Sequence, residues 1–219
     1  MKRFKFASSV YLLTVLGGFA CNSNSTSSLD IYNGEYTGEK WNATGALLVG
    51  GQNFCSVSLI HPKVAITAAH CLNEFTTADT PFLELTFEAD AEIELIPRRK
   101  GNIVKVKSFG FRDISYFHMT RQNNFDVGYL LLETPVDDVS IIPPLLDYYE
   151  RRDSLLPGKT VTIVGYGNRE DGYSGKRQST EVTIESINSS EVNFTSEEGK
   201  GSCFGDSGGP AFLQLANKW

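Results

Sequence analysis

Beyond residue 20 the chain has no long hydrophobic run, and taken as a whole it carries no surplus of positive charge. The first absence argues against a membrane-spanning helix in that part of the sequence. Because 20 Lys and Arg stand against 26 Asp and Glu, a formal net charge of -6, the composition disfavours nucleic acid as a partner. The three His and four Cys form no cluster with the spacing of a zinc site. We therefore expect no metal and no other cofactor, with a calcium-binding loop as the open alternative.

The apolar stretches that are present are short, rich in β-branched residues and separated by turn-forming residues. They lie at residues 64–67, 104–106, 161–164 and 181–184. This pattern predicts an all-β fold, either one globular unit or two small barrels, although periodicity alone does not choose between a barrel and a sandwich. The only helix expected is a short one at residues 68–72. With 219 residues, the chain is long enough to bury a sizeable core.

Two segments far apart in the sequence carry residues suited to nucleophilic catalysis. Residues 67–71 read Thr-Ala-Ala-His-Cys, and residues 205–210 read Gly-Asp-Ser-Gly-Gly-Pro. A serine hydroxyl is a weak nucleophile at neutral pH, so it needs a nearby base and amide donors for the charge that it creates. Histidine is the side chain that ordinarily titrates near neutrality. We therefore predict Ser207 as the nucleophile and His70 as its base.

The third catalytic residue is predicted to be Asp126, which directly precedes the apolar run Val-Gly-Tyr-Leu-Leu-Leu at residues 127–132. Such a run is expected to bury a carboxylate beside the histidine. Asp113, the main competitor, lacks a continuous apolar run. His61 and His118 lack comparable surroundings and are assigned structural roles.

These three segments resemble those of the chymotrypsin family of serine peptidases, in which the catalytic residues also follow the order His, Asp, Ser. Residues 55–60, a strand that begins with cysteine, and residues 164–167, Val-Gly-Tyr-Gly, are similar to further segments of that family. The resemblance implies two antiparallel six-stranded β-barrels, the first at residues 31–137 and the second, incomplete, at residues 138–219. It also implies a serine endopeptidase that hydrolyses polypeptide substrates through an acyl-enzyme.

The resemblance assigns further roles around the serine. The backbone N–H groups of Gly205 and Ser207 would form an oxyanion hole for the charge that develops on the substrate. Cleavage before Ile31 would free an ammonium group, and this group would pair with Asp206 and order the turn. The enzyme that would cleave after Asp30 is not predicted, and activity without cleavage is the alternative.

The resemblance also implies a disulfide and a substrate pocket. Cys55 and Cys71 would form the disulfide, with a pair of free thiols as the alternative. Gly201, Ser202 and Phe204 would line the pocket for the side chain that precedes the scissile bond. Because no carboxylate stands at Gly201 to pair with Lys or Arg, we expect a preference for uncharged side chains.

The N-terminus has the pattern of an export signal. Residues 1–20 begin with basic residues, continue with an apolar stretch and end on small residues around Phe19, which predicts a secretory signal peptide and permits disulfides. Cys21 follows directly, and residues 21–30 form a polar tether or propeptide, similar to the tether behind the lipid-bearing cysteine of bacterial lipoproteins. We expect a lipid on Cys21 to attach the protein to the membrane of the bacterial cell envelope. The alternative is ordinary secretion with Cys21 as a thiol.

The C-terminus departs from the family pattern. The sequence ends nine residues after Pro210, whereas family members continue with further strands of the second barrel. We expect this to leave unpaired strand edges. Two alternatives to the peptidase therefore stay open: a catalytically inert homologue with a binding role or none, and an esterase or other acyl hydrolase. The oligomeric state is not predicted.

Overall fold

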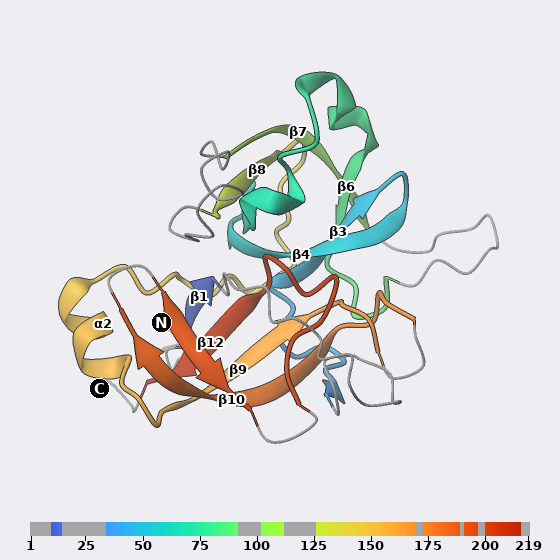
Figure 1. Ribbon diagram of the computed structural model, residues 1–219. Helices are drawn as coiled ribbons and strands as arrows, with labels where there is room; N and C mark the ends of the chain where they lie inside the picture. The colour runs from blue at the N-terminus through green and yellow to red at the C-terminus, as the bar shows by residue number, and fades with distance from the viewer. Residues whose placement is uncertain are drawn as a thin grey trace, which may run out of the picture.

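The computed structural model describes residues 10–14, 34–91, 102–111, 126–169, 173–188, 191–196 and 200–215. Within these residues the chain is mostly β-sheet, arranged as one closed barrel and one curved open sheet (Figure 1). The structure thereby confirms the predicted all-β class, with a complete first barrel and an incomplete second one.

The first barrel consists of antiparallel strands in the order β3-β4-β5-β8-β7-β6. The strands are β3 (Thr44–Val49), β4 (Gln52–His61), β5 (Val64–Thr67), β6 (Leu83–Thr86), β7 (Ile103–Phe111) and β8 (Gly128–Leu132). In β8, burial alternates along the strand, since Leu130 and Leu132 are buried whereas Tyr129 and Leu131 are exposed. This period of two is expected of a strand with one face on a core. The core includes Leu47, Val57, Leu59, Leu85, Val106 and Leu130.

The second unit is an open sheet in the order β1-β12-β9-β10-β11, and β2 also pairs with β10. The strands are β1 (Val10–Thr14), β2 (Glu35–Tyr36), β9 (Thr160–Gly165), β10 (Gln178–Ile187), β11 (Val192–Thr195) and β12 (Pro210–Gln214). The sheet has a core of its own, which includes Val161, Ile163, Val182, Ile184, Phe194 and Leu213. Each of the two units thus buries its own set of apolar side chains.

Strand β1 lies within the segment that the sequence predicts to be a signal peptide. It pairs antiparallel with β12, from Val10 opposite Gln214 to Thr14 opposite Pro210. The edge of β12 that faces away from β9 is therefore occupied by β1 in this structure. The signal peptide itself stays a prediction.

In the part of the chain that the structure describes, three short helices interrupt the sheets. The 3-10 turn η1 (Ala69–Cys71) lies where the sequence predicts a short helix, but η2 (Thr77–Phe82) and α2 (Tyr148–Ser154) show that the expectation of a single helix was wrong. Helix α2 begins where the side chain of Asp147 accepts the backbone N–H of Glu150 at 2.8 Å, an N-cap bond. Within the described residues, no helix is long and apolar enough to cross a membrane.

Apolar side chains join the two units. Val164 and Phe212 of the second sheet pack with Trp41, Ile60 and Ile66. The ring of Trp41 stacks on that of Phe212 with 4.4 Å between their centroids. These contacts place β5, which contains Ile66, next to β12, which contains Phe212.

A buried arginine also joins the two units. Arg177 is 1% exposed, and its guanidinium donates to the carbonyls of Gly38 (2.7 Å), Phe87 (2.9 Å) and Thr44 (3.1 Å) and to the hydroxyl of Tyr166 (3.1 Å). Burial raises the pKa of Tyr166, and the Arg177 cation opposes part of that rise. Because Arg177 bonds carbonyls of the first barrel and the tyrosine that follows β9, one side chain fixes the second sheet against the first barrel.

Candidate active site

His70 lies on η1, directly after β5. The buried side chains of Ala69 and Cys71 hold this turn against the first barrel, whereas the side chain of His70 is 37% exposed. Cys71 forms the predicted disulfide with Cys55 of β4, with 6.4 Å between their Cα atoms. A loop of this length is expected to stabilise the fold by about 3 kcal/mol. The disulfide therefore fixes the turn that carries the imidazole to the neighbouring strand.

The pairing of β5 with β8 brings Asp126 to His70. Thr67, the last residue of β5, lies opposite Gly128, the first residue of β8. Because the strands are antiparallel, the residues just after β5 and just before β8 meet at the same end of the barrel. Oδ2 of Asp126 lies 2.6 Å from Nδ1 of His70, and Oδ1 accepts the backbone N–H of His70 at 2.7 Å.

Asp126 is buried, at 5% exposure, and its pKa is lowered from the ordinary value of an aspartate. Burial alone raises the pKa of this carboxyl. The hydrogen bond and the charge of the His70 side chain, together with the backbone N–H groups of His70 and Ala69, lower it by more. The carboxylate is thus held in its ionised form beside the imidazole.

Ser207 lies in a turn that contacts the end of β5. The carbonyl of Ser207 accepts the backbone N–H of Ser56 in β4 at 2.9 Å, and it lies 3.8 Å from Sγ of Cys71. The next residue, Gly208, has φ +81°, and a Cβ there would lie 2.1 Å from Oγ1 of Thr67. Only glycine permits both this backbone and this approach. The glycine thereby allows the serine to lie next to the turn that carries the histidine.

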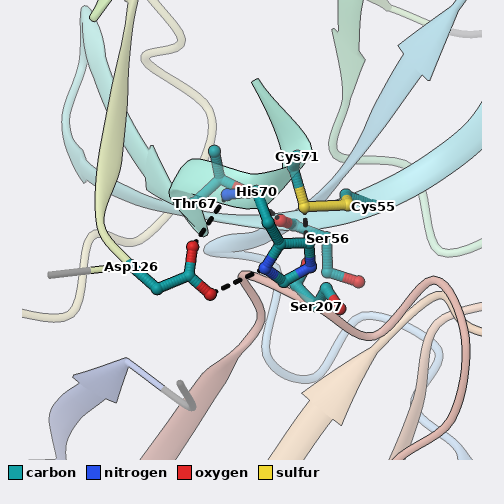
Figure 2. A network of polar contacts seen from close by, with 7 residues as sticks. All are labelled: Cys55, Ser56, Thr67, His70, Cys71, Asp126 and Ser207. Carbon is teal, nitrogen blue, oxygen red and sulfur yellow. Dashed lines mark hydrogen bonds and ion pairs between the residues drawn. A yellow bond between two sulfur atoms is a disulfide. The ribbon is translucent and has the colours of Figure 1, made fainter. Parts of the chain in front are cut away.

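Figure 2 shows the imidazole of His70 between Asp126 and Ser207. Since Nδ1 faces the carboxylate, Nε2 is the ring nitrogen available to the serine. In the part of the chain that the structure describes, no hydrogen bond joins the hydroxyl of Ser207 to His70. Such bonds are often long without substrate and tighten when substrate binds. The structure thus brings together the three side chains that the sequence predicts to act together.

Two backbone N–H groups in the serine turn, those of Gly205 and of Ser207 itself, are available to a ligand. Gly205 has φ +95°, and a Cβ there would lie 3.0 Å from Cα of Gly167. Among the described residues, the N–H groups of Gly205 and Ser207 donate to no other group. The N–H of Asp206 between them donates to the carbonyl of Cys203 at 3.1 Å. Two amides without a protein acceptor are what an oxyanion hole requires.

Asp206 is 7% exposed and is bonded at both carboxylate oxygens. Oδ1 accepts the N–H of Gly167 at 2.7 Å, and Oδ2 accepts that of Cys203 at 2.8 Å. These bonds connect the serine turn to the segment that follows β9. Ile31 and Cys21 lie outside the described residues. The ion pair of Ile31 with Asp206 and the lipid on Cys21 therefore stay predictions.

The residues predicted to line the substrate pocket lie on the segment that enters the serine turn. Gly201 and Ser202 are half-buried, and Phe204 is 73% exposed. Their role in a pocket stays a prediction. Asp113 and His118 lie outside the described residues.

One group of side chains has the spacing of metal ligands, but two of its members form a disulfide. Among the described residues, one group of candidate ligands was found, in which a ring nitrogen of His70 and the sulfurs of Cys55 and Cys71 lie within 4.8 Å of one another. The two sulfurs form a disulfide and are not thiolates, the form of cysteine that binds metals. The group therefore reflects the disulfide beside the histidine.

Ser56 is a polar residue at the site that the sequence analysis did not single out. It is fully buried in β4, and its hydroxyl donates to the carbonyl of Gly205 at 2.9 Å. The available signal was a serine directly after Cys55, in the buried middle of the strand.

Comparison with known proteins agrees with this geometry. Residues 31–216 match the family model named Trypsin. The chain is 28% identical to a trypsin of Saccharopolyspora erythraea over 178 residues, which are 73% of this chain and 70% of that protein. It is 23% identical to human testisin over 224 aligned positions, which cover 82% of this chain and 63% of testisin, so it spans less than two thirds of that relative.

Solved structures show the same fold. Human heparin binding protein superposes with a TM-score of 0.64 at 19% identity, covering 83% of this chain and 80% of that one. The likeness at this identity concerns the fold alone. Together with the family model, which matches most of the sequence, these findings show that the chain belongs to the trypsin family of serine peptidases.

Proposed function

We propose that this protein is a serine endopeptidase in which Ser207 is the nucleophile, His70 the general base and Asp126 the residue that orients the imidazole. The observation that carries the proposal is the 2.6 Å contact between Nδ1 of His70 and Oδ2 of Asp126, which leaves Nε2 for the serine. The lowered pKa of Asp126 supports it, because an ionised carboxylate fixes the proton on Nδ1 and stabilises the imidazolium that forms during the reaction.

The first half of the reaction forms an acyl-enzyme. Oγ of Ser207 bonds to the carbonyl carbon of the scissile peptide while Nε2 of His70 takes the hydroxyl proton. The amides of Gly205 and Ser207 bind the oxygen that becomes negative. When the C–N bond breaks, the imidazolium gives its proton to the leaving amine. The acyl group then stays on Ser207 as an ester.

The second half of the reaction restores the enzyme. A water molecule attacks the ester carbon, and Nε2 of His70 takes its proton. The same two amides bind the second oxyanion. Collapse of this intermediate breaks the bond to Oγ, and His70 returns its proton to Ser207. The products are a new carboxylic acid and the free serine.

The proposed substrates are polypeptides with an uncharged side chain before the cleaved bond. The support is the glycine at position 201, which has no carboxylate to pair with Lys or Arg. A buried carboxylate lies close in sequence at Asp206, but both of its oxygens accept backbone N–H groups. These two bonds hold the serine turn, and the proposal assigns Asp206 no contact with the substrate side chain.

Export and activation belong to the proposal as well. The disulfide between Cys55 and Cys71 supports an oxidising compartment. A lipid on Cys21 would hold the enzyme at the cell envelope, and incorporation of labelled palmitate that is lost in Cys21→Ser tests this point. Cleavage before Ile31 would supply the ammonium partner for Asp206, and N-terminal sequencing of the active protein shows whether Ile31 comes first.

The function is tested by incubating the purified chain with a set of peptides and identifying cleavage products by mass spectrometry. The proposal predicts cleavage by the wild type and none by Ser207→Ala or His70→Ala. His61→Ala is the matched control, because His61 is exposed and, among the residues that the structure describes, its ring accepts only the backbone N–H of Lys63. Equal cleavage by Ser207→Ala contradicts the proposal. No cleavage by any form favours the inert homologue.

A further inference from the structure

We propose that Ser56 is a positioning residue that holds the oxyanion hole from the opposite barrel. The inference rests on the proposed function and adds a residue outside the triad and the oxyanion hole. Ser56 is fully buried in β4 of the first barrel, so it does not meet substrate. It acts through the carbonyl groups of Gly205 and Ser207.

Ser56 bonds the carbonyls of both residues whose amides are left for the oxyanion. Its hydroxyl donates to the carbonyl of Gly205 at 2.9 Å, and its backbone N–H donates to the carbonyl of Ser207 at 2.9 Å. Each bond fixes the orientation of the peptide plane that follows the residue in question. The planes held in this way are the Gly205–Asp206 and Ser207–Gly208 peptides, so the amide of Ser207 lies between two fixed planes and the amide of Gly205 directly precedes the first.

The neighbouring tyrosine gives the hydroxyl of Ser56 its direction. The backbone N–H of Tyr166 donates to Oγ of Ser56 at 3.0 Å. An amide N–H can only donate, so Oγ must accept this bond and use its single hydrogen toward Gly205. Tyr166 in turn is held by its own hydroxyl, which donates to the carbonyl of Glu88 at 2.6 Å. The serine is therefore not free to rotate away from Gly205.

The backbone carbonyl of Ser56 bonds to the segment that leads to His70. Its carbonyl accepts the hydroxyl of Thr67 at 2.8 Å, three residues before His70 (Figure 2). All the hydrogen-bonding groups of Ser56 are thus engaged, one with the segment leading to the base and the others around the nucleophile. One buried residue relates the two halves of the site to each other.

Two residues further along β4 the chain offers a matched control. Ser58 is also buried, at 1% exposure, but its hydroxyl has no hydrogen-bond partner in the described part of the chain. Replacing Ser58 by alanine removes the same atom from the same strand and breaks no hydrogen bond. A difference between Ser56→Ala and Ser58→Ala therefore reports the bonds of the Ser56 hydroxyl and not the loss of a buried oxygen as such.

Loss of the Ser56 hydroxyl is expected to reduce kcat with KM unchanged. The oxyanion donors interact more strongly with the transition state than with the bound substrate, so misplacing them lowers kcat and kcat/KM together. Because positional errors of about 1 Å can cost about 10²-fold in rate, we expect a reduction of about 10- to 100-fold. The labelling rate of Ser207 by a fluorophosphonate, which also develops charge at this site, should fall by the same factor.

The experiment measures the fluorophosphonate labelling rate of Ser207 in the full chain, together with kcat and KM for a peptide that the wild type cleaves. Wild type, Ser56→Ala, Ser56→Thr and Ser58→Ala are compared below their unfolding temperatures. The inference predicts slow labelling and a low kcat in Ser56→Ala alone. Ser58→Ala should behave as wild type, and Ser56→Thr, which keeps the hydroxyl, should recover most of the rate.

The outcomes separate this inference from the proposed function. If the wild type is labelled at Ser207 and folded Ser56→Ala is labelled equally fast, Ser56 is not a positioning residue while the peptidase assignment stands. If Ser56→Ala does not fold, slow labelling of folded Ser56→Thr overturns the inference. An equal loss in Ser56→Ala and Ser58→Ala also overturns it. If the wild type is not labelled at all, the proposed function fails and this inference fails with it.

Discussion

Asp126 binds His70 at two points, because Oδ1 accepts the backbone N–H at 2.7 Å while Oδ2 lies 2.6 Å from Nδ1 of the ring. One carboxylate thus sets both the position of the main chain at His70 and the orientation of its imidazole. This double contact follows from the register that places Thr67 opposite Gly128.

The first prediction concerns the charge of Asp126. Asp126→Asn keeps the shape of the side chain, but an amide NH₂ in place of an oxygen beside Nδ1 favours the tautomer with its proton on Nε2, which cannot accept the serine proton. By analogy with other triads we expect kcat to fall by about 10⁴-fold. Peptide hydrolysis measures it, with the exposed Asp137→Asn as control. A reduction below tenfold, with the variant folded, would remove Asp126 from the triad.

The second prediction concerns stability in acid. The pKa of Asp126 is lower in the folded chain than its ordinary value, so the unfolded chain takes up this proton first as the pH falls. The stability that Asp126 contributes is therefore present at neutral pH and is lost as the pH falls below about 4 toward the folded pKa. Thermal unfolding between neutral pH and pH 3 should show a steeper loss of Tm in wild type than in Asp126→Asn. Identical pH profiles would contradict the lowered pKa.

The third prediction concerns the junction between the two units. Arg177→Ala leaves the buried carbonyl of Phe87 without its donor and the carbonyl of Thr44 with only the Tyr166 hydroxyl at 3.2 Å, so we expect the free energy of unfolding to fall by at least about 3 kcal/mol. Urea unfolding measures this value. The exposed Arg151→Ala is the control and should change it by less than about 0.5 kcal/mol. Equal effects of the two substitutions would show that the buried bonds of Arg177 contribute little.

The strands, and the segments that carry the proposed triad, could be predicted from the sequence because their signals are local. The β-branched run at residues 161–164 forms most of β9, and the residues around His70 and Ser207 carried the family resemblance that the comparisons confirmed. Helix α2 was missed because its signal is an N-cap, Asp147, without an apolar period, and none of its residues is buried. A helix without a core-facing stripe gives periodicity analysis nothing to detect.

Contacts between segments distant in sequence could not be predicted from local sequence signals. The bond of the Ser56 hydroxyl to Gly205 spans 149 positions, and that of Arg177 to Thr44 spans 133. Nothing in the local sequence of either residue specifies its partner. Such bonds depend on how the two units pack, which only the structure supplies.

The fourth prediction concerns substrate preference. Peptides with Phe, Leu, Ala or Val before the cleaved bond should have a higher kcat/KM than matched peptides with Lys or Arg, because Gly201 offers no charge partner. A peptide series that varies only this position measures the ratio. A tenfold or greater preference for Arg would contradict the proposed pocket and would require a carboxylate from another segment.

The measurement that tests the central claim most directly is the site of covalent modification by a fluorophosphonate, identified by mass spectrometry of the digested protein. The account predicts modification of Ser207 in the wild type, with no modification in His70→Ala because the hydroxyl then has no base. Modification of a different residue, or labelling of His70→Ala at the wild-type rate, would contradict the assignment of Ser207 and His70 as nucleophile and base.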